Sequence, residues 1–308
     1  MSGLIAIVGP TASGKTRLAL HLAQLLCGEI IGADSRQIYY DVNIAVDKPT
    51  EGERALVPHH LIDFVSPDCD FTLAQYREQA LPIIADIQRR GKVPFLVGGT
   101  GLYVWSIIEG WDIPHVLPDI KLRHDLEIRA GEEGIAALYS ELQQIDPAGA
   151  KRINPHNLRR IIRALEVYYT TGKPFSALLS KTAPGFNSLI IGLTLERSKL
   201  YYRIDARVDD MVRKGLVEET HKLLAKGYRL ESPAMTGLGY KHIARYLRGE
   251  IALSDAVQQI KYDTHHFARR QYAWFRLADA RIHWFDISKE GFEQEVIQLA
   301  HDFLTTLS

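Results

Sequence analysis

The chain is poor in cysteine and has no long apolar run. Cys27 and Cys69 are its only cysteines among 308 residues, and two cysteines cannot form a disulfide framework or a CxxC metal site. No apolar stretch is long enough to span a bilayer, and no basic segment precedes the apolar N-terminal stretch as it would in a signal peptide. We therefore expect a cytoplasmic protein with no membrane partner.

An excess of charge of either sign is also absent. Lys and Arg together number 37, as do Asp and Glu, so the formal net charge is zero. The charge of the whole molecule therefore does not predict a nucleic-acid partner, and only local clusters can. An apolar fraction of 46% and a charged fraction of 24% are typical of a globular protein with a sizeable core.

Short apolar runs alternate with helical patterns along much of the chain. The expected strands are residues 4–8, 29–32, 93–97, 189–195 and 282–285. Strands separated by helical stretches predict an α/β fold, with a parallel sheet and helices on both faces. Ligands bind beyond the carboxyl ends of the strands in such sheets, and Gly9, Asp34 and Gly99 follow three of these runs.

The middle of the chain has a different composition. Residues 112–146 contain eight acidic and three basic side chains, whereas residues 151–173 contain six basic side chains and only Glu166 as an acid. We expect residues 112–196 to form a helical insertion, with residues 1–111 and 197–308 forming the core.

A phosphate-binding loop follows the first expected strand. Residues 9–16 fit the pattern G-x-x-x-x-G-K-[ST] between a buried strand and a helix start, where backbone N–H groups attract phosphate oxygens. The lysine adds a positive charge, and the last hydroxyl can bind Mg²⁺. The expected diphosphate-binding residues are Gly9, Pro10, Thr11, Ala12, Ser13, Gly14, Lys15 and Thr16, with Thr16 on the metal.

Asp34 and the glycines after residue 97 stand where ligands are expected. Asp34 could accept a proton or hold Mg²⁺ through water, and it could equally be a helix N-cap. Gly98, Gly99 and Thr100 occupy the place where many ATPases carry an acid for Mg²⁺. The missing acid argues against ordinary ATP hydrolysis, and the glycines are typical of a close backbone approach to a ligand.

Arginines cluster in two segments near aromatic residues. Residues 159–163 and 269–276 suit a nucleic-acid backbone and unstacked bases, although a solvated helix face with core aromatics explains them equally well. Arg203 and Arg207 lie one turn apart on an expected helix, and either could reach a diphosphate, although a solvated surface arginine is the simpler reading of each alone.

The ordered set of motifs resembles the bacterial tRNA dimethylallyltransferases over nearly the whole chain. The phosphate loop alone is shared by many families, whereas the set with DSRQIY and GGTGLY is specific. The matching segments are GPTASGKT at 9–16, DSRQIY at 34–39, PHHLID at 58–63, GGTGLY at 98–103, RRIIRALEVY at 159–168, TGKP at 171–174, GLGY at 237–240 and ARRQYAWFR at 268–276.

The resemblance implies a P-loop nucleotide-kinase-like core and an inserted helical domain that grips the anticodon stem-loop. It implies dimethylallyl diphosphate and Mg²⁺ at the phosphate loop, N6 of adenosine 37 as acceptor, and a monomer. Asp34 matches the general base, Thr100 a residue near the target base, and Arg207 a diphosphate ligand. The implied tRNA-contacting residues are Asp34, Ser35, Arg36, Gln37, Thr100, Arg123, Arg159, Arg160, Ile161, Ile162, Arg163, Thr236, Gly239, Lys241, Arg269, Arg270, Gln271, Trp274 and Arg276.

The chain departs from the family pattern at three places. A GTAKP-like stretch is usual where this chain has Ile44–Pro49, so the departure falls on Ala45–Asp47. A histidine is usual at Asn154, and a threonine is usual at Ala273. These departures concern secondary contacts with tRNA rather than the reaction.

Three other functions share parts of this pattern. An isopentenyltransferase acting on free AMP or ADP would need the phosphate loop and Asp34 but neither the insertion nor the arginine-rich segments. A P-loop small-molecule kinase would be expected to carry an acid after residue 97. A non-catalytic nucleotide-binding RNA module would not need Lys15, Thr16 and Asp34 together.

Overall fold

The computed structural model describes residues 3–307, which fold into two compact units. The core unit comprises Met1–Phe71, Gln75–Ile108 and Pro184–Ser308, and the helical unit comprises Thr72–Ala74 and Glu109–Ala183. No helix among the described residues is long and apolar enough to cross a membrane.

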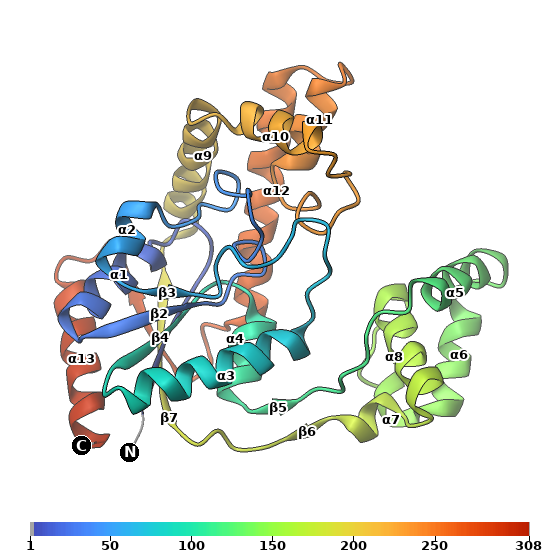
Figure 1. Cartoon of the computed structure of the whole chain (residues 1–308), viewed down its shortest axis with the longest axis horizontal. Helices are drawn as coiled ribbons and strands as arrows, with labels where there is room; N and C mark the ends of the chain where they lie inside the picture. The colour runs from blue at the N-terminus through green and yellow to red at the C-terminus, as the bar shows by residue number, and fades with distance from the viewer. Residues whose placement is uncertain (1–2, 308) are drawn as a thin grey trace. The chain divides into compact units, whose positions relative to one another are not determined.

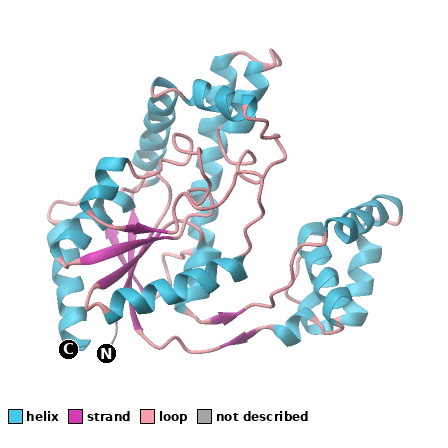
Figure 2. Cartoon of the chain, viewed as in Figure 1, coloured by secondary structure: helices cyan, strands magenta, loops and turns pink. Residues whose placement is uncertain are grey.

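A six-stranded parallel sheet forms the centre of the core unit (Figures 1 and 2). Its order is β3-β2-β4-β1-β7-β8, and β1 lies between β4 and β7. The register places Ile5 beside Phe95 on one side and beside Leu189 on the other. The strands are β1 (Gly3–Val8), β2 (Gly28–Gly32), β3 (His59–His60), β4 (Val93–Val97), β7 (Asn187–Thr194) and β8 (Ile282–Asp286).

Alternate residues of each strand enter different cores because successive side chains point to opposite faces. Ile5 and Ile7 of β1 pack with Leu18 and Leu22 of α1 (Lys15–Leu25) and with Val296 of α13 (Phe292–Leu307). On the other face, α3 (Leu73–Arg89) is tied to the sheet by a hydrogen bond from the Tyr76 hydroxyl to Gly32 O at 3.0 Å. Helices therefore cover both faces, as the sequence predicts for an α/β fold.

A second hydrophobic core joins the C-terminal helices to the chain between β2 and β3. Ile38 and Val42 pack there with Val208 and Met211 of α9 (Arg197–Arg213) and with Leu216 of α10 (Leu216–Ala225). The helices of the core unit not yet given are α2 (Glu51–Leu56), α4 (Gly101–Ile108), α11 (Tyr240–Leu247) and α12 (Leu253–Trp274).

The helical unit has its own core. Leu126, Leu138, Leu142 and Leu165 are buried there by 99% or more. Its elements are β5 (Trp111–Asp112), α5 (Ile120–Glu132), α6 (Ile135–Ile145), α7 (Pro147–Ala150), α8 (Leu158–Thr171), the 3-10 helix η1 (Phe175–Leu178) and β6 (Ser180–Lys181), with β5 and β6 antiparallel.

Strands form at all five expected places, and the structure adds β3 and the β5–β6 ribbon. The helical unit ends at Ala183 rather than at residue 196, because β7 pairs with β1 and β8 and so belongs to the core unit. The β5–β6 pairing explains the earlier N-terminal boundary, since β5 begins at Trp111.

Candidate active site

The phosphate loop, residues 9–14, connects β1 to α1 at the carboxyl edge of the sheet. Gly9 has a φ of 142°, and a Cβ there would lie 2.5 Å from Leu193 O, so no side chain fits. Ala12 adopts a left-handed φ of 63°, and such strain is typical of functional loops. The loop ends at Gly14, the N-cap of α1, so backbone N–H groups converge as phosphate binding requires.

Two distant side chains hold the loop in place. Gln271 of α12 is 4% exposed; its Oε1 accepts from Thr11 N at 2.8 Å, and its Nε2 donates to Gly99 O at 3.1 Å. Arg207 of α9 donates to Thr11 Oγ1 at 2.6 Å. Gln271 thus connects the phosphate loop to the turn after β4, and Arg207 lies directly on the loop.

The Lys15 side chain folds back on its own loop. Its Nζ donates to Pro10 O at 2.7 Å. Burial lowers the pKa of Lys15 to about 8; Asp34 and Asp47 act in the opposite direction, and Arg207 adds to the lowering. These four charged groups therefore lie within electrostatic range of one another.

Asp34 follows β2, in a turn fastened to the end of β4. Its Oδ1 accepts from Arg36 N at 2.8 Å. The Thr100 hydroxyl accepts from Ser35 N at 3.0 Å, and Thr100 N donates to Ala33 O at 3.1 Å. Asp34 therefore forms an Asx-type turn and is not a helix N-cap, because the next helix along the chain, α2, begins at Glu51 and is capped by Thr50.

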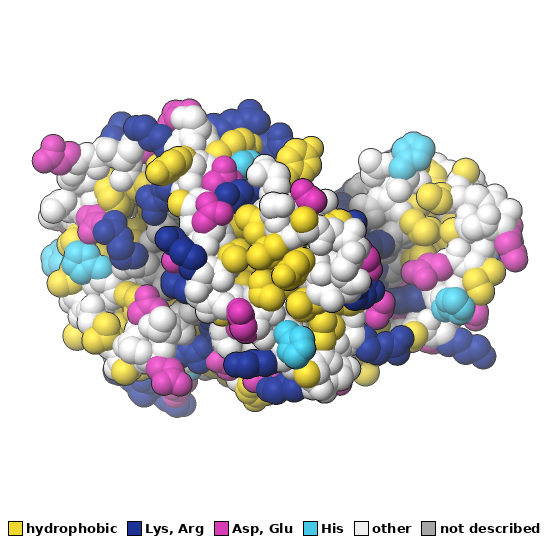
Figure 3. Space-filling model, turned by 90° about the horizontal axis from the view of Figure 1, so that it is seen from above, with side chains coloured by type: hydrophobic (Ala, Val, Ile, Leu, Met, Phe, Trp, Pro, Cys, Tyr) yellow, Lys and Arg dark blue, Asp and Glu magenta, His cyan; other side chains and the backbone are white. Residues whose placement is uncertain are grey.

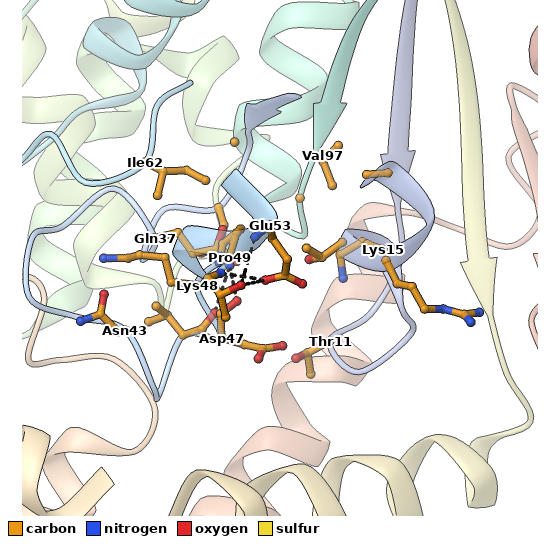
Figure 4. Close-up of a pocket in the computed structure, with 18 of the residues that line it drawn as sticks. Thr11, Lys15, Gln37, Asn43, Asp47, Lys48, Pro49, Glu53, Ile62 and Val97 are labelled. Atoms are coloured by element: carbon orange, nitrogen blue, oxygen red, sulfur yellow. Dashed lines mark hydrogen bonds between the residues drawn. The ribbon is translucent and has the colours of Figure 1, made fainter. Parts of the chain in front are cut away.

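One cavity of about 730 Å³ brings these groups together. Figure 4 shows Lys15 and Thr11 on one side of it and Gln37 and Lys48 on the other. The lining residues central to the site are Thr11, Gly14, Lys15, Thr16, Asp34, Gln37, Asp47, Lys48, Asp63, Gly98, Arg207 and Gln271.

The segment of residues 43–54 forms a wall of this cavity. We expected Ile44–Pro49 to make secondary contacts with tRNA, whereas the structure places most of this stretch in the cavity lining. Lys48 is buried, and its Nζ donates to Tyr39 O at 2.7 Å and pairs with Asp63. Asp47 Oδ2 lies 3.7 Å from Arg207. The one local signal was Thr50 with Glu53, a capping box that starts α2.

In the helical unit, the expected tRNA-contacting residues divide into exposed, paired and buried groups. Arg159 and Arg160 are exposed on the first turn of α8. Arg123 and Arg163 both bind the buried Glu166 carboxylate, at 2.8 and 2.6 Å. Ile161 and Ile162 lie in the hydrophobic core, where their side chains are at most 4% exposed.

In the core unit, the expected tRNA-contacting residues differ in the same way. Arg269, Arg270 and Arg276 are exposed, and Lys241 pairs with Asp263 at 3.2 Å.

Other residues of that set hold the fold locally. Arg36 donates to Thr236 Oγ1 at 3.1 Å, and Gln37 Nε2 donates to Val46 O at 3.1 Å. Gly239 is the N-cap of α11. Trp274 occupies the space beside Gly101, where a Cβ at residue 101 would lie 2.4 Å from its ring.

The fold and the cavity define a class: an α/β enzyme with a phosphate-binding loop whose cavity also contains a carboxylate, Asp34, at the end of the neighbouring strand. Comparisons with known proteins then identify the family. The family model described as IPP transferase matches residues 37–278. This chain belongs to that family, the tRNA dimethylallyltransferases.

Relatives and solved structures agree with that assignment. A tRNA dimethylallyltransferase of Roseiflexus sp. (strain RS-1) is 54% identical over 276 residues, which is 90% of each chain. The crystal structure of the tRNA isopentenylpyrophosphate transferase of Bacillus halodurans is 40% identical, with a TM-score of 0.72 over 99% of this chain and 96% of that one. A eukaryotic dimethylallyltransferase acting on tRNA is 27% identical, with a TM-score of 0.83 over 99% of this chain and 80% of that one.

Proposed function

We propose that this chain transfers the dimethylallyl group of dimethylallyl diphosphate to N6 of adenosine 37 in tRNA and releases pyrophosphate. The observation that carries the proposal is that one cavity is lined by both the phosphate loop and Asp34. A transferase acting on a weakly nucleophilic amine needs both the phosphate loop and a proton acceptor. A P-loop kinase can use the same two groups, but it would be expected to carry an acid after residue 97, where this chain has Gly98 and Gly99.

The phosphate loop and two cations are proposed to bind the diphosphate. Backbone N–H groups of residues 9–14, the Lys15 ammonium and the Arg207 guanidinium would neutralise the charge that grows on the leaving group as the C1–O bond breaks. Arg207 supports this role because its Nε is buried and has no hydrogen-bond acceptor among residues 3–307. A diphosphate oxygen would supply that acceptor.

The residues present fit a Mg²⁺ ion that is shared with the diphosphate. Thr16 and Asp34 both line the cavity, and their hydroxyl and carboxylate oxygens are of the kind that Mg²⁺ prefers. Residues 3–307 contain no cluster of three His, Cys, Asp or Glu side chains that would hold a metal alone. Mg²⁺ usually takes few protein ligands and completes its shell with phosphate oxygens and water. When bound, it would add positive charge beside the leaving group.

Asp34 is proposed as the general base. As N6 bonds to C1 of the dimethylallyl group, the electron pair of the C1–O bond leaves with pyrophosphate, and the N6 proton passes to the Asp34 carboxylate. Thr100 would position this turn, since its hydroxyl already accepts from Ser35 N.

The acceptor is proposed to be an anticodon stem-loop with its target base extruded. The exposed arginines on α8 and α12 support this, and the helical unit is proposed to grip the stem-loop. We propose that the protein is a monomer and that it acts on tRNA in the cytoplasm.

Labelled dimethylallyl diphosphate offered with either an anticodon stem-loop RNA or free AMP tests the proposal. We expect label on the RNA only. Equal labelling of AMP would assign the chain to the free-nucleotide isopentenyltransferases, and label on neither acceptor would refute the transferase proposal.

A further inference from the structure

Asp47 places a negative charge where the diphosphate of the proposed donor must bind. It lines the cavity, and its Oδ2 lies 3.7 Å from Arg207. The same arginine donates to Thr11 Oγ1 of the phosphate loop. In Figure 4, Asp47 lies on the side of the cavity wall, residues 43–54, that faces Thr11. Its side chain is 62% exposed, so a ligand in the cavity can reach it.

The fold of its segment holds Asp47 in this position. Its backbone is left-handed, with a φ of 52°, which non-glycine residues rarely adopt. Asp47 N donates to Ile44 O at 3.2 Å, and the Gln37 side chain donates to Asp47 O at 3.0 Å. Glu219 of α10 accepts from Ile44 N at 3.0 Å. These bonds fix the backbone of Asp47, and with it the position of the carboxylate in the cavity wall.

Arg207 has two possible partners for one guanidinium. Asp47 forms an ion pair with Arg207 at the long distance of 3.7 Å, while the Arg207 Nε has no acceptor among the described residues. A diphosphate oxygen carries more charge than a carboxylate oxygen and can accept in a charge-assisted hydrogen bond. The diphosphate would therefore replace Asp47 as the partner of Arg207. It would do so even though the Asp47 carboxylate repels the negative charge of the diphosphate.

We propose that Asp47 is a resident counter-ion of Arg207, displaced when the diphosphate binds and paired with Arg207 again when pyrophosphate leaves. The inference rests on the proposed function, since it assumes a diphosphate at the phosphate loop. Its consequence is that Asp47 weakens the binding of the product pyrophosphate and so speeds its release.

The test is Asp47→Asn, measured by calorimetric titration with pyrophosphate and Mg²⁺ at low salt. Asparagine tolerates a left-handed backbone, so the segment should keep its shape. We expect the variant to bind pyrophosphate at least about threefold more tightly, the size expected for removing one exposed like charge. The difference should shrink as KCl rises, because salt screens exposed charges.

Asp41→Asn is the matched control. Asp41 also has a left-handed backbone, with a φ of 61°, but it pairs with Lys226 at 2.6 Å and does not line the cavity. This variant should bind pyrophosphate as the wild type does.

Provided that the wild type binds pyrophosphate, two results would overturn this inference and leave the proposed function standing. One is unchanged affinity in Asp47→Asn. The other is weaker affinity, which would instead place Asp47 on a cation that bridges it to the ligand. A wild type that binds no pyrophosphate would remove the proposed function and the inference with it.

Discussion

The proposed proton transfer depends on a single side chain, the carboxylate of Asp34. Asp34→Asn keeps an oxygen that can accept from Arg36 N, so the turn should hold its conformation. We expect the single-turnover rate at saturating donor to fall on the order of a hundredfold, as is usual when a general base is lost. Binding of tRNA should change little. A rate within about threefold of the wild type would exclude Asp34 as the base.

The family resemblance implies that Gln271 contacts tRNA, whereas in the structure its side chain supports the phosphate loop. A substitution at this residue can separate the two roles. Gln271→Leu removes both hydrogen bonds, to Thr11 N and to Gly99 O, and leaves two backbone groups unpaired. We expect a loss of about 1–3 kcal/mol in the free energy of unfolding and a raised KM for the donor. The Kd for tRNA, measured without donor, should stay the same. A raised Kd for tRNA with an unchanged donor KM would instead show that Gln271 contacts tRNA, as the family resemblance implies.

Site residues close to a strand end were predictable from the sequence, and those set by distant contacts were not. Gly9, Lys15 and Asp34 each follow a recognisable strand, so their meeting at one edge follows from a parallel sheet. Asp47 lines the cavity and pairs there with Arg207, which lies 160 residues further along the chain. Composition and spacing in a single sequence contain no signal for such a pair.

At the level of elements, α8 depends on the buried carboxylate of Glu166. Glu166 is 0% exposed; it accepts from Arg123 and Arg163 and from Asp119 N at 2.8 Å. Burial opposes its ionisation, but the two arginines and the backbone N–H outweigh burial and lower its pKa. Glu166 therefore joins α8, α5 and the residue before α5.

We expect Glu166→Gln to reduce the free energy of unfolding at pH 7 by about 2–4 kcal/mol, because it breaks a buried ionic network. A carboxylate whose pKa is lowered by folding stabilises the fold above its unfolded pKa, near 4.5, and loses this effect as the pH falls through the folded value. Urea unfolding at pH 7 and below pH 4.5 measures this effect. The difference in free energy of unfolding between variant and wild type should be smaller in acid. If the difference in free energy of unfolding between variant and wild type does not change with pH, the negative charge of Glu166 does not stabilise the fold.

The organisation of α8 also shows what local patterns cannot resolve. Its 3.6-residue period predicts a helix, and Asn157 caps it. The run Arg159–Arg163 reads as one basic cluster, yet Ile161 and Ile162 are buried and Arg163 serves Glu166. Only the packing of α8 against α5 and α6 decides which face carries free charge.

At the scale of the whole molecule, the formal net charge is zero. Figure 3 shows Lys and Arg side chains interspersed with acidic ones on the face in view, as the zero net charge suggests. Affinity for RNA must then come from particular arginines whose charge is not already paired. Arg159 and Arg160 meet this condition, since within residues 3–307 neither guanidinium takes part in an ion pair or a hydrogen bond.

These two arginines lie in the first turn of α8, which contains no acidic residue. Cations at a helix N-terminus are unfavourable for the helix dipole, so they do not stabilise α8, and together with the dipole they attract phosphate. We expect Arg159→Ala with Arg160→Ala to raise the KM for tRNA and to lower the slope of log affinity against log salt by about one unit per lost phosphate contact. Donor affinity should not change. The control is Arg89→Ala with Lys289→Ala, which removes two exposed charges from other surfaces, one of them paired with Asp86, and should keep the wild-type slope. If the α8 variant also keeps that slope, the stem-loop does not contact this turn of the helix.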